Sequence, residues 1–303
     1  MKAHIFTNDT LNNNIYEKDS VIALGSFYSF HIGHQEIFKN TLKIASEKKL
    51  SSGIILFNEK GLFPKKETYS LNWRVNYLDK LGFDFVIIFD KTINNMSLEG
   101  NEFIKILSKN YGAKEYVCGN DFSFGKNRKW NTSMLMQKHS VKIVPTVKID
   151  NVKVATTLVN EVIERGDLEL LKVLLDRSYS VYGNVVHGEG NGAKFGFKTA
   201  NIDLGNNLVE IPDGVYITYL KIEDKLYPSV TSVGKKPTIH KNYKKTYETH
   251  ILNFNKNIYS KNVECFFLKK IRDQERYESI AELIKQIRKD KDFTIDWFIN
   301  NKL

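Results

Sequence analysis

Residues 21–49 read VIALGSFYSFHIGHQEIFKNTLKIASEKK, and this stretch decides the fold of the first half of the chain. Val21–Gly25 is an apolar run of strand length. Gly33–Lys49 carries apolar residues at helical spacing, beginning with Ile37 and Phe38. A buried strand that leads directly into an amphipathic helix is typical of a β-α-β unit, in which strands pair in parallel through a right-handed crossover.

The same alternation continues to residue 119. Further strands are predicted at Gly53–Phe57, Phe85–Phe89 and Glu115–Gly119, and further helices at Leu71–Leu81 and Glu99–Tyr111. This pattern predicts an open, doubly wound α/β sheet of the Rossmann-like kind. In such sheets, ligands bind at the carboxyl ends of the strands.

Beyond the first half, the pattern changes from alternating elements to consecutive strands. A connecting helix is predicted at Glu161–Asp176 and a closing helix at Ser279–Lys289. Between them the sequence predicts strands at Val215–Ile222, Leu226–Val233, Glu248–Phe254 and Asn262–Lys270. Strands with short polar links favour an antiparallel sheet or a small barrel. We therefore predict two domains, residues 1–178 and 179–303, with the boundary near Arg177–Tyr179.

Length and composition limit the classes of protein to which the chain can belong. Its 303 residues include 45 Lys and Arg against 35 Asp and Glu, so the formal net charge is 45 − 35 = +10. The basic residues are scattered and no binding motif accompanies them, so we expect neither a nucleic-acid partner nor a membrane partner. Two distant cysteines, Cys118 and Cys265, exclude a disulfide framework. No apolar run reaches the ~18 residues of a spanning helix and no signal peptide is recognisable, so we expect a cytoplasmic protein.

Two predicted strand ends carry residues that suit a nucleotide. Residues 25–34, GSFYSFHIGH, place His31 and His34 at the start of the first helix, where free N–H groups and the helix dipole favour phosphate. A metal role is less attractive for them, because no carboxylate or cysteine lies near at ligand spacing. Residues 119–125, GNDFSFG, follow a strand, and their aromatic rings suit stacking on a flat ring. Taken alone, each segment has an equally simple explanation as a structural turn.

A glycine-rich stretch, GNVVHGEGNGAKFGF at residues 183–197, follows the predicted boundary. Such a stretch lets backbone amides approach phosphate oxygens, although it is neither a Walker A loop nor a dinucleotide fingerprint. Thr199 and Asn201 follow on an extended segment, where residues two apart share a face and both oxygens can reach one Mg²⁺. Glu248, at the start of a later strand, is suited to take a proton from a hydroxyl nucleophile.

Together and in this order, these segments resemble the bacterial bifunctional riboflavin kinase/FAD synthetases over nearly the full chain. The first half resembles their nucleotidyltransferase-type adenylyltransferase domain, and residues from about 180 onward resemble their six-stranded-barrel kinase domain. The blocks that match the kinase signature are Gly183–Gly188, Phe195–Asn201, Gly214–Tyr216, Gly234–Thr238, Glu248–His250 and Ile271–Arg272 followed by Tyr277.

The resemblance implies roles for residues of the kinase domain. Thr199 and Asn201 would hold Mg²⁺ with ATP, and Glu248 would be the base for the ribityl hydroxyl of riboflavin. Arg272 is expected to bind the nucleotide, and the loop glycines would cover its phosphates: Gly188, Gly190, Gly192 and Gly196. Lys198 stands where the family has proline. This replacement makes the turn less stiff but removes no metal ligand, and a lysine there can also contact phosphate.

The adenylyltransferase half departs further from the family. The expected catalytic residues, His31 and His34, are present, as are the expected nucleotide-binding residues Gly25, Phe27, Asn120 and Asp121. However, Tyr28 replaces an acid, the proline-rich segment after the second strand reads FNEKG at residues 57–61, and Asn160 replaces the arginine that would hold the triphosphate. Because Asn cannot imitate a bidentate Arg, we hypothesise that adenylyl transfer is weakened or lost unless Arg128 or Arg165 compensates.

The resemblance therefore predicts an enzyme that makes FMN from riboflavin and ATP, and FAD from FMN and a second ATP with release of pyrophosphate. Two alternatives stay open: a riboflavin kinase with a vestigial second domain, and a protein that binds flavin or nucleotide without turnover. A third alternative, a nucleic-acid-binding protein, is suggested only by the net charge. The flavin contacts, the oligomeric state and any preference for reduced flavin cannot be read from the sequence.

Overall fold

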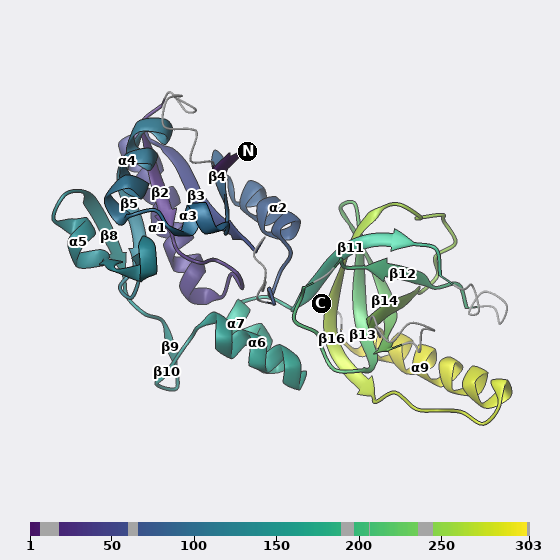
Figure 1. The fold of residues 1–303 in the computed structure, drawn as a ribbon. Helices are drawn as coiled ribbons and strands as arrows, with labels where there is room; N and C mark the ends of the chain where they lie inside the picture. Colours follow the sequence, from purple (N-terminus) through teal and green to yellow (C-terminus); the bar gives the residue numbers. More distant parts are fainter. Residues whose placement is uncertain (7–17, 60–65, 189–196, 206, 236–244, 302–303) are drawn as a thin grey trace. The chain divides into compact units, whose positions relative to one another are not determined.

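The computed structural model of the chain describes residues 1–6, 18–59, 66–188, 197–205, 207–235 and 245–301. The chain divides into two compact units, Met1–Val159 and Asn160–Leu303, and each unit has its own main sheet (Figure 1). The predicted fold class is confirmed: a parallel α/β unit is followed by a closed, antiparallel, six-stranded barrel with a closing helix. The boundary predicted at residue 178 stays a prediction, and the second unit begins before it, at Asn160.

The main sheet of the first unit is parallel throughout. Its strand order is β1-β4-β3-β2-β5-β8. The strands are β1 (Lys2–Phe6), β2 (Ser20–Leu24), β3 (Ser51–Asn58), β4 (Phe85–Asp90), β5 (Ala113–Gly119) and β8 (Ser140–Val144). Two small antiparallel hairpins accompany it, β6 (Ser123–Phe124) with β7 (Trp130–Asn131), and β9 (Lys148–Ile149) with β10 (Val152–Lys153). A short 3-10 helix, η2 (Lys126–Arg128), lies within the first hairpin.

The helices that accompany this sheet are α1 (Ile32–Lys48), α2 (Leu71–Leu81), α3 (Ile93–Met96), α4 (Gly100–Tyr111) and α5 (Thr132–Met136). Helices α1 and α4 pack through the apolar faces that the sequence spacing predicts, whereas α2 buries Trp73, Arg74 and Leu78 and leaves Leu81 exposed. Phe103 and Leu107 of α4 join a buried cluster with Ile22, Phe85 and Tyr116 of the sheet. Helix α1 contacts β2, β3, β5 and β8, so its N-terminus is held at the carboxyl end of β2.

The segment Val21–Gly25 is not the first strand of the sheet. β1 precedes it in the chain and pairs in parallel with β4 at the far edge of the sheet. The sequence analysis missed β1 because most of its residues are not buried and it is short. The strand predicted at Val21–Gly25, now β2, instead lies in the interior of the sheet, and all five of its residues are buried.

The second unit is built on a barrel whose strands follow the closed order β11-β12-β15-β14-β13-β16. The strands are β11 (Ser180–Val186), β12 (Ala200–Asp203), β13 (Gly214–Ile222), β14 (Lys225–Lys235), β15 (Lys245–Ile251) and β16 (Asn262–Arg272). The first and last strands of the barrel, β11 and β16, pair in antiparallel register from Ser180 opposite Phe266 to Asn184 opposite Asn262. This pairing closes the sheet and leaves no free edge.

The barrel interior contains a ladder of hydroxyl groups. Thr218 lies 2.8 Å from both Ser229 and Thr231, measured between side-chain oxygens, and Thr231 lies 2.8 Å from Thr249. All four residues are fully buried. Because each hydroxyl can both donate and accept, the ladder satisfies these groups without water. Thr231 also contacts the thiol of Cys265.

Two helices at the start of the second unit replace the single connecting helix predicted at Glu161–Asp176. They are α6 (Thr156–Arg165) and α7 (Leu168–Leu175), and Gly166 between them has a φ of +74°. That left-handed conformation ends α6, and Asp167 then caps α7 by accepting a hydrogen bond from the backbone N–H of Leu170 at 3.0 Å. Sequence periodicity missed this break because the apolar spacing continues across it.

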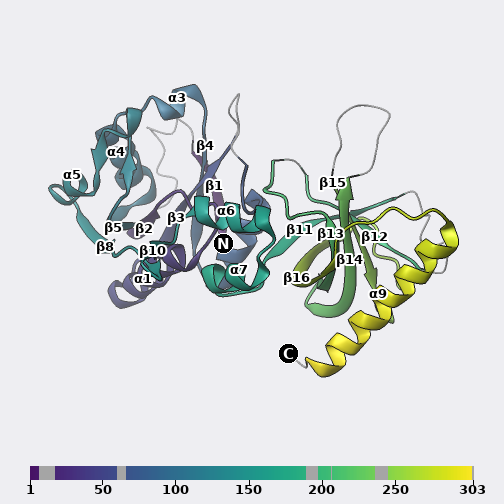
Figure 2. The same cartoon turned by 90° about the horizontal axis from the view of Figure 1, so that it is seen from below.

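The closing helix is longer than predicted. Helix α9 (Ile280–Asn300) runs beside the barrel well beyond Lys289, where the prediction ended it (Figure 2). The charged residues 289–292 suggest a solvated helix end, but Asp290 among them is only 5% exposed and bonds to the barrel.

The two cysteines provide a test of the folded core in each unit. Cys118 and Cys265 are both fully buried, and burial raises the pKa of Cys118 to about 12 and that of Cys265 to about 11. We expect neither thiol to react with Ellman's reagent at pH 8 during the minutes in which both react in urea, because the reactive form is the thiolate. Rapid reaction of one thiol in native buffer would contradict the packing described for that unit.

Candidate functional site

The first cavity lies where the strand order of the parallel sheet reverses. The chain passes from β2 to β3 and β4 on one side, and later places β5 on the other side of β2. The carboxyl ends of β2 and β5 therefore border a crevice of about 220 Å³, which we call the switch-point cavity. Its walls include five of the predicted site residues: Gly25, His31, His34, Asn120 and Asp121.

His31 and His34 lie together at the start of α1. His31 Nδ1 accepts a hydrogen bond from the backbone N–H of His34 at 3.2 Å and so caps the helix. The two rings are stacked, with centroids 3.7 Å apart. Because Nδ1 of His31 accepts, the neutral ring carries its proton on Nε2, from which it can be donated to an anion at the helix N-terminus.

The turn after β5 supplies the opposite wall of this cavity. Thr146 donates a hydrogen bond to Asn120 Oδ1 at 2.7 Å, which orients the carboxamide. Asp121 forms an ion pair with Lys153, and the hydrogen bond from this lysine is the main cause that lowers the pKa of Asp121. Arg128 also lines the cavity, but its Nε donates to the neutral Ser123 hydroxyl at 2.8 Å, so its charge is not compensated by that partner.

Phe27 does not line this cavity, although the resemblance implies that it binds nucleotide. Its ring is fully buried, with its centroid 5.2 Å from the ring centroids of both His34 and Phe38. A Cβ at Gly25 would lie 2.6 Å from Phe27 Cζ, so the ring fills the space beside that glycine. The structure therefore places Phe27 in the packing behind the histidine pair.

A second cavity, of about 440 Å³, adjoins the first near the ends of β2, β3 and β4. We call it the aromatic cavity because its walls include Phe57, Phe89, Phe122 and Phe124. The rings of Phe122 and Phe124 are stacked with centroids 5.3 Å apart. Six residues line both cavities: Leu24, Gly25, Ser26, Phe122, Ser123 and Arg128. Ligands in the two cavities can therefore touch each other.

Two positions that depart from the family pattern meet at the wall of the aromatic cavity. The Tyr28 hydroxyl donates to Glu59 Oε1, which also accepts from Lys91 Nζ at 2.5 Å. Lys91 Nζ lies 5.2 Å from the ring centroid of Tyr28 and 5.5 Å from that of Phe57. Burial and the bond to Glu59 raise the pKa of Tyr28 far above its usual value, so the phenol stays protonated. The sequence analysis missed this cluster because 31 positions separate Tyr28 from Glu59.

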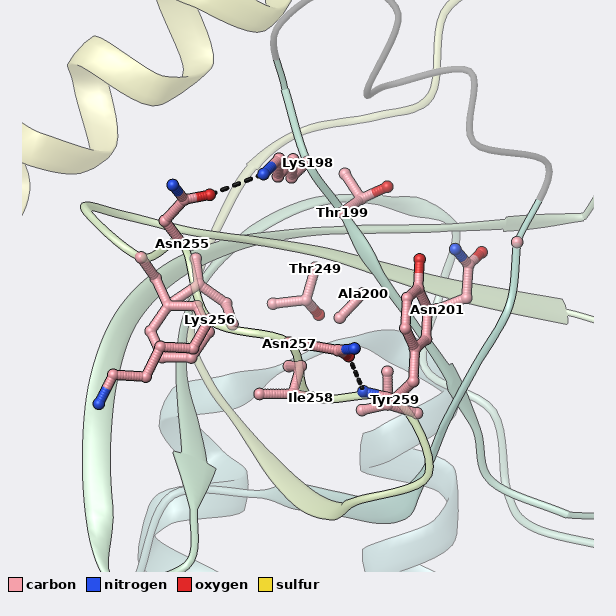
Figure 3. A pocket seen from close by; sticks show the side chains of 14 residues that line it. Lys198, Thr199, Ala200, Asn201, Thr249, Asn255, Lys256, Asn257, Ile258 and Tyr259 are labelled. Atoms are coloured by element: carbon pink, nitrogen blue, oxygen red, sulfur yellow. Dashed lines mark hydrogen bonds between the residues drawn. The ribbon is translucent and has the colours of Figure 1, made fainter.

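The second unit contains a cavity of about 300 Å³, which we call the barrel cavity (Figure 3). One wall is formed by Lys198, Thr199 and Asn201 before and within β12. The opposite wall is residues 254–259 of the connection between β15 and β16. Lys198 Nζ joins the two walls by donating a hydrogen bond to Asn255 Oδ1 at 2.7 Å.

Gly188 and Glu248 both lie beside Asn201. A Cβ at Gly188 would lie 2.0 Å from Asn201 Nδ2, so the carboxamide occupies the space that any side chain at Gly188 would need. Glu248 of β15 is the register partner of Asn201 on β12 and of Ser232 on β14, so these side chains share one face of the barrel wall. Gly188, Thr199 and Asn201 line the barrel cavity, whereas Glu248 is a neighbour of its lining.

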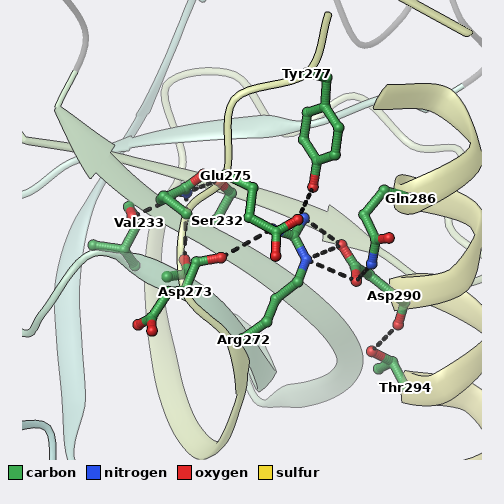
Figure 4. A network of polar contacts seen from close by, with 11 residues as sticks. Ser232, Val233, Arg272, Asp273, Glu275, Tyr277, Gln286, Asp290 and Thr294 are labelled. Carbon is green, nitrogen blue, oxygen red and sulfur yellow. Dashed lines mark hydrogen bonds and ion pairs between the residues drawn. The ribbon is translucent and has the colours of Figure 1, made fainter. Parts of the chain in front are cut away.

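Arg272 is held by α9 and does not line the barrel cavity (Figure 4). Its guanidinium donates to the Asp290 carboxylate from Nε at 3.1 Å and from Nη2 at 2.8 Å. Burial disfavours the charge on Arg272, but Asp290 more than offsets this effect, so the pKa of Arg272 lies above its usual value. Gln286 donates to the same carboxylate at 2.9 Å. The structure therefore places Arg272 as the anchor of α9.

The other predicted site residues lie in segments that the structure does not describe. Gly190, Gly192 and Gly196 fall outside the described residues, as do Pro237 and Thr238 of another matched block. The sequence did not lead us to expect residues 254–259 in the wall of the barrel cavity. The polar run Asn255–Asn257 was the feature that could have indicated a binding segment there. Within the described chain, no three His, Cys, Asp or Glu side chains gather to hold a metal ion on their own.

Comparisons with known proteins agree with this arrangement. Residues 13–158 match the family model for FAD synthetase, and residues 175–298 match the family model for riboflavin kinase. The two units and their cavities thus define a two-domain, ATP-using transferase. The chain belongs to the family of bifunctional riboflavin kinase/FMN adenylyltransferases.

Individual relatives extend over nearly the whole chain. A protein of Buchnera aphidicola subsp. Acyrthosiphon pisum with that family name is 30% identical over 92% of this chain and 94% of its own length. Its Bacillus subtilis namesake is 29% identical over 93% of each chain. A crystal structure described as a macrolide-efflux protein from Streptococcus pneumoniae has a TM-score of 0.85 and 29% identity, covering 98% of this chain and 100% of that one. No helix in the described part of this chain is long and apolar enough to cross a membrane.

The Arg272–Asp290 pair provides a test of how α9 is attached. Asp290→Asn keeps the size of the side chain but removes the charge, and leaves the partly buried guanidinium without its counter-ion. We expect the free energy of unfolding of the second unit to fall by about 3 kcal/mol, measured by urea unfolding followed by circular dichroism. Asp292→Asn, at an exposed position of the same helix, is the matched control. Equal stability of the two variants would contradict the anchoring role.

Proposed function

We propose that this enzyme phosphorylates riboflavin at the barrel cavity, and adenylylates the resulting FMN at the switch-point and aromatic cavities. The observation that supports it most is the separation of two sets of residues. Thr199 and Asn201 line a cavity in one unit, and His31 and His34 line a cavity in the other. Each unit thus has its own cavity, which supports one phosphoryl chemistry in each.

In the kinase reaction, the terminal ribityl hydroxyl of riboflavin would attack the γ-phosphorus of ATP. The new bond joins that oxygen to phosphorus, the bond to the β–γ bridging oxygen breaks, and ADP leaves. Glu248 would receive the hydroxyl proton, a role supported by its position opposite Asn201 in the barrel wall. Such transfers depend mainly on positioning and on neutralising phosphate charge.

The residues of the barrel cavity fit a bound Mg²⁺. Thr199 and Asn201 offer a hydroxyl and a carboxamide oxygen, which are hard, neutral ligands of the kind that Mg²⁺ accepts beside nucleotide phosphates. The fit is supported by Gly188, whose missing side chain leaves the space that the Asn201 carboxamide fills. We propose that these two residues hold the ion, which when bound would neutralise charge on the phosphate oxygens.

In the adenylyltransferase reaction, a phosphate oxygen of FMN would attack the α-phosphorus of a second ATP. The bond from the α-phosphorus to the bridging oxygen breaks, and pyrophosphate leaves. His31 Nε2–H at the N-terminus of α1 is suited to donate to the developing charge on phosphate. The flavin ring would lie against Phe122 and Phe124 in the aromatic cavity, whose shared border with the switch-point cavity brings FMN and ATP together.

Arg128 is the better supported substitute for the arginine that Asn160 replaces. It lines both cavities of the first unit, and neither lining includes Arg165. We therefore propose that this chain keeps adenylyltransferase activity at a reduced rate. We also propose that it works in the cytoplasm, a reducing compartment that suits two free, buried thiols.

Incubation of the purified protein with riboflavin, ATP and Mg²⁺, followed by chromatography of the flavins, tests the proposal. We expect FMN to appear first and FAD to follow more slowly. FMN alone would mean a riboflavin kinase with a vestigial second domain. Absence of both products would mean a protein that binds its ligands without turnover.

Variants of the two sites should separate the two activities. Glu248→Gln removes the base, and we expect it to slow FMN formation from riboflavin by roughly 10²-fold or more while FAD formation from supplied FMN is unchanged. His31→Ala should do the reverse, and each variant is the folding control for the other. Loss of both activities in either variant would contradict two separate sites.

Restoring the missing arginine should accelerate FAD synthesis. We expect Asn160→Arg to raise kcat/KM for FAD formation from FMN by about tenfold, because a charged contact to phosphate typically contributes that much. Asn160→Gln, which lengthens the side chain without adding charge, is the matched control. Equal rates for the two variants would mean that position 160 does not reach the triphosphate.

A further inference from the structure

Lys198 presents a positive charge beside the proposed Mg²⁺ ligands. It immediately precedes Thr199, its side chain is exposed, and it lines the barrel cavity with Thr199 and Asn201. Its amino group is fixed by a single short hydrogen bond to Asn255 Oδ1, at 2.7 Å across the cavity (Figure 3). This hydrogen bond directs the ammonium group across the cavity toward the wall at residues 254–259.

The partner of Lys198 is neutral, and this distinguishes it from other cations at the two sites. Lys91 and Lys153 pair with Glu59 and Asp121 in the first unit, and Arg272 pairs with Asp290 in the second. A carboxamide orients an ammonium group without cancelling its charge. Among the described residues, no carboxylate forms an ion pair with Lys198, and none lines the barrel cavity.

The backbone at Lys198 is fixed as well. Its carbonyl oxygen lies 2.8 Å from His250 Nδ1, and because a carbonyl can only accept, the ring nitrogen donates. His250 also contacts Phe197, with ring centroids 5.8 Å apart. These contacts tie the turn before Thr199 to β15, and so supply part of the rigidity that a proline would give.

From this arrangement we infer that Lys198 is a phosphate-binding residue of the kinase site, which contacts the phosphates of ATP held between Thr199 and the wall at residues 254–259. This inference rests on the proposed riboflavin kinase activity. An ammonium group with no acidic partner among the described residues, in a cavity with no described acidic lining residue, favours an anionic ligand. Lys198 would thereby supply the positive charge that the resemblance implies for Arg272, whose guanidinium instead pairs with Asp290.

Steady-state kinetics of FMN formation from riboflavin would test this inference, because that reaction reports on the barrel cavity alone. We expect Lys198→Gln to raise both KM for ATP and the inhibition constant of ADP by about 10- to 100-fold, as for loss of one charged hydrogen bond. The inhibition constant of adenosine, which has no phosphate, should stay unchanged. Lys198→Arg should remain close to wild type, and Asn255→Ala should show a smaller loss because the charge remains.

Lys256→Gln is the matched control. Lys256 lines the same cavity, but its amino group points away from Thr199 and Asn201 (Figure 3). FAD formation from supplied FMN, and the melting temperature, report whether each variant is folded. The inference is overturned if Lys198→Gln changes the ADP constant less than twofold, if adenosine weakens equally, or if Lys256→Gln has the same effect. A wild-type protein that makes no FMN would overturn the kinase assignment itself, and this is seen before any variant is compared.

Discussion

Both sites depend on strand ends at which a side chain has no room. Gly25 directly follows β2, and Gly188 lies two residues after β11. A Cβ at the first would lie 2.6 Å from the ring of Phe27, and a Cβ at the second would lie 2.0 Å from the carboxamide of Asn201. Glycine therefore lets each strand end pack directly against a large or polar side chain, and a Cβ at either position would require that side chain to move. In the first unit this strand end leads to the histidine pair, and in the second it borders the proposed metal ligands.

The proposed polyphosphate sites of the two units are built from different structural elements. The parallel sheet offers its strand ends and the N-terminus of α1, where His31 caps the helix through Nδ1 and lines the cavity. Among the described residues that line the barrel cavity, none belongs to a helix. Its described phosphate-facing groups are a hydroxyl, a carboxamide and the ammonium group of Lys198, held between β12 and the connection after β15. Closure of β11 onto β16 keeps these segments together.

Apolar periodicity in the sequence was enough to predict the fold class and most elements, because α1 and α4 each bury one regular face and the inner strands β2 and β3 of the parallel sheet contain continuous buried apolar runs. It failed where tertiary structure overrides the local pattern. Gly166 breaks an apolar repeat into α6 and α7, and α9 continues through a charged run because Asp290 meets Arg272. The sequence was enough to select residues for the candidate sites, but not to predict the residues with which they form hydrogen bonds and ion pairs. Lys198 and Asn255 are 57 positions apart, and only the folded barrel brings them together.

In our proposal, two separately built sites act in one chain, and the barrel site depends on the close approach of Gly188 to Asn201. The most direct test is the kinetics of Gly188→Ala with riboflavin or with FMN as the starting flavin. The new methyl group must displace the Asn201 carboxamide, a small movement for the fold but a large one for a metal ligand. We predict loss of FMN formation from riboflavin, with FAD formation from supplied FMN unchanged. An unchanged rate of riboflavin phosphorylation, or equal loss of both activities, would contradict the account.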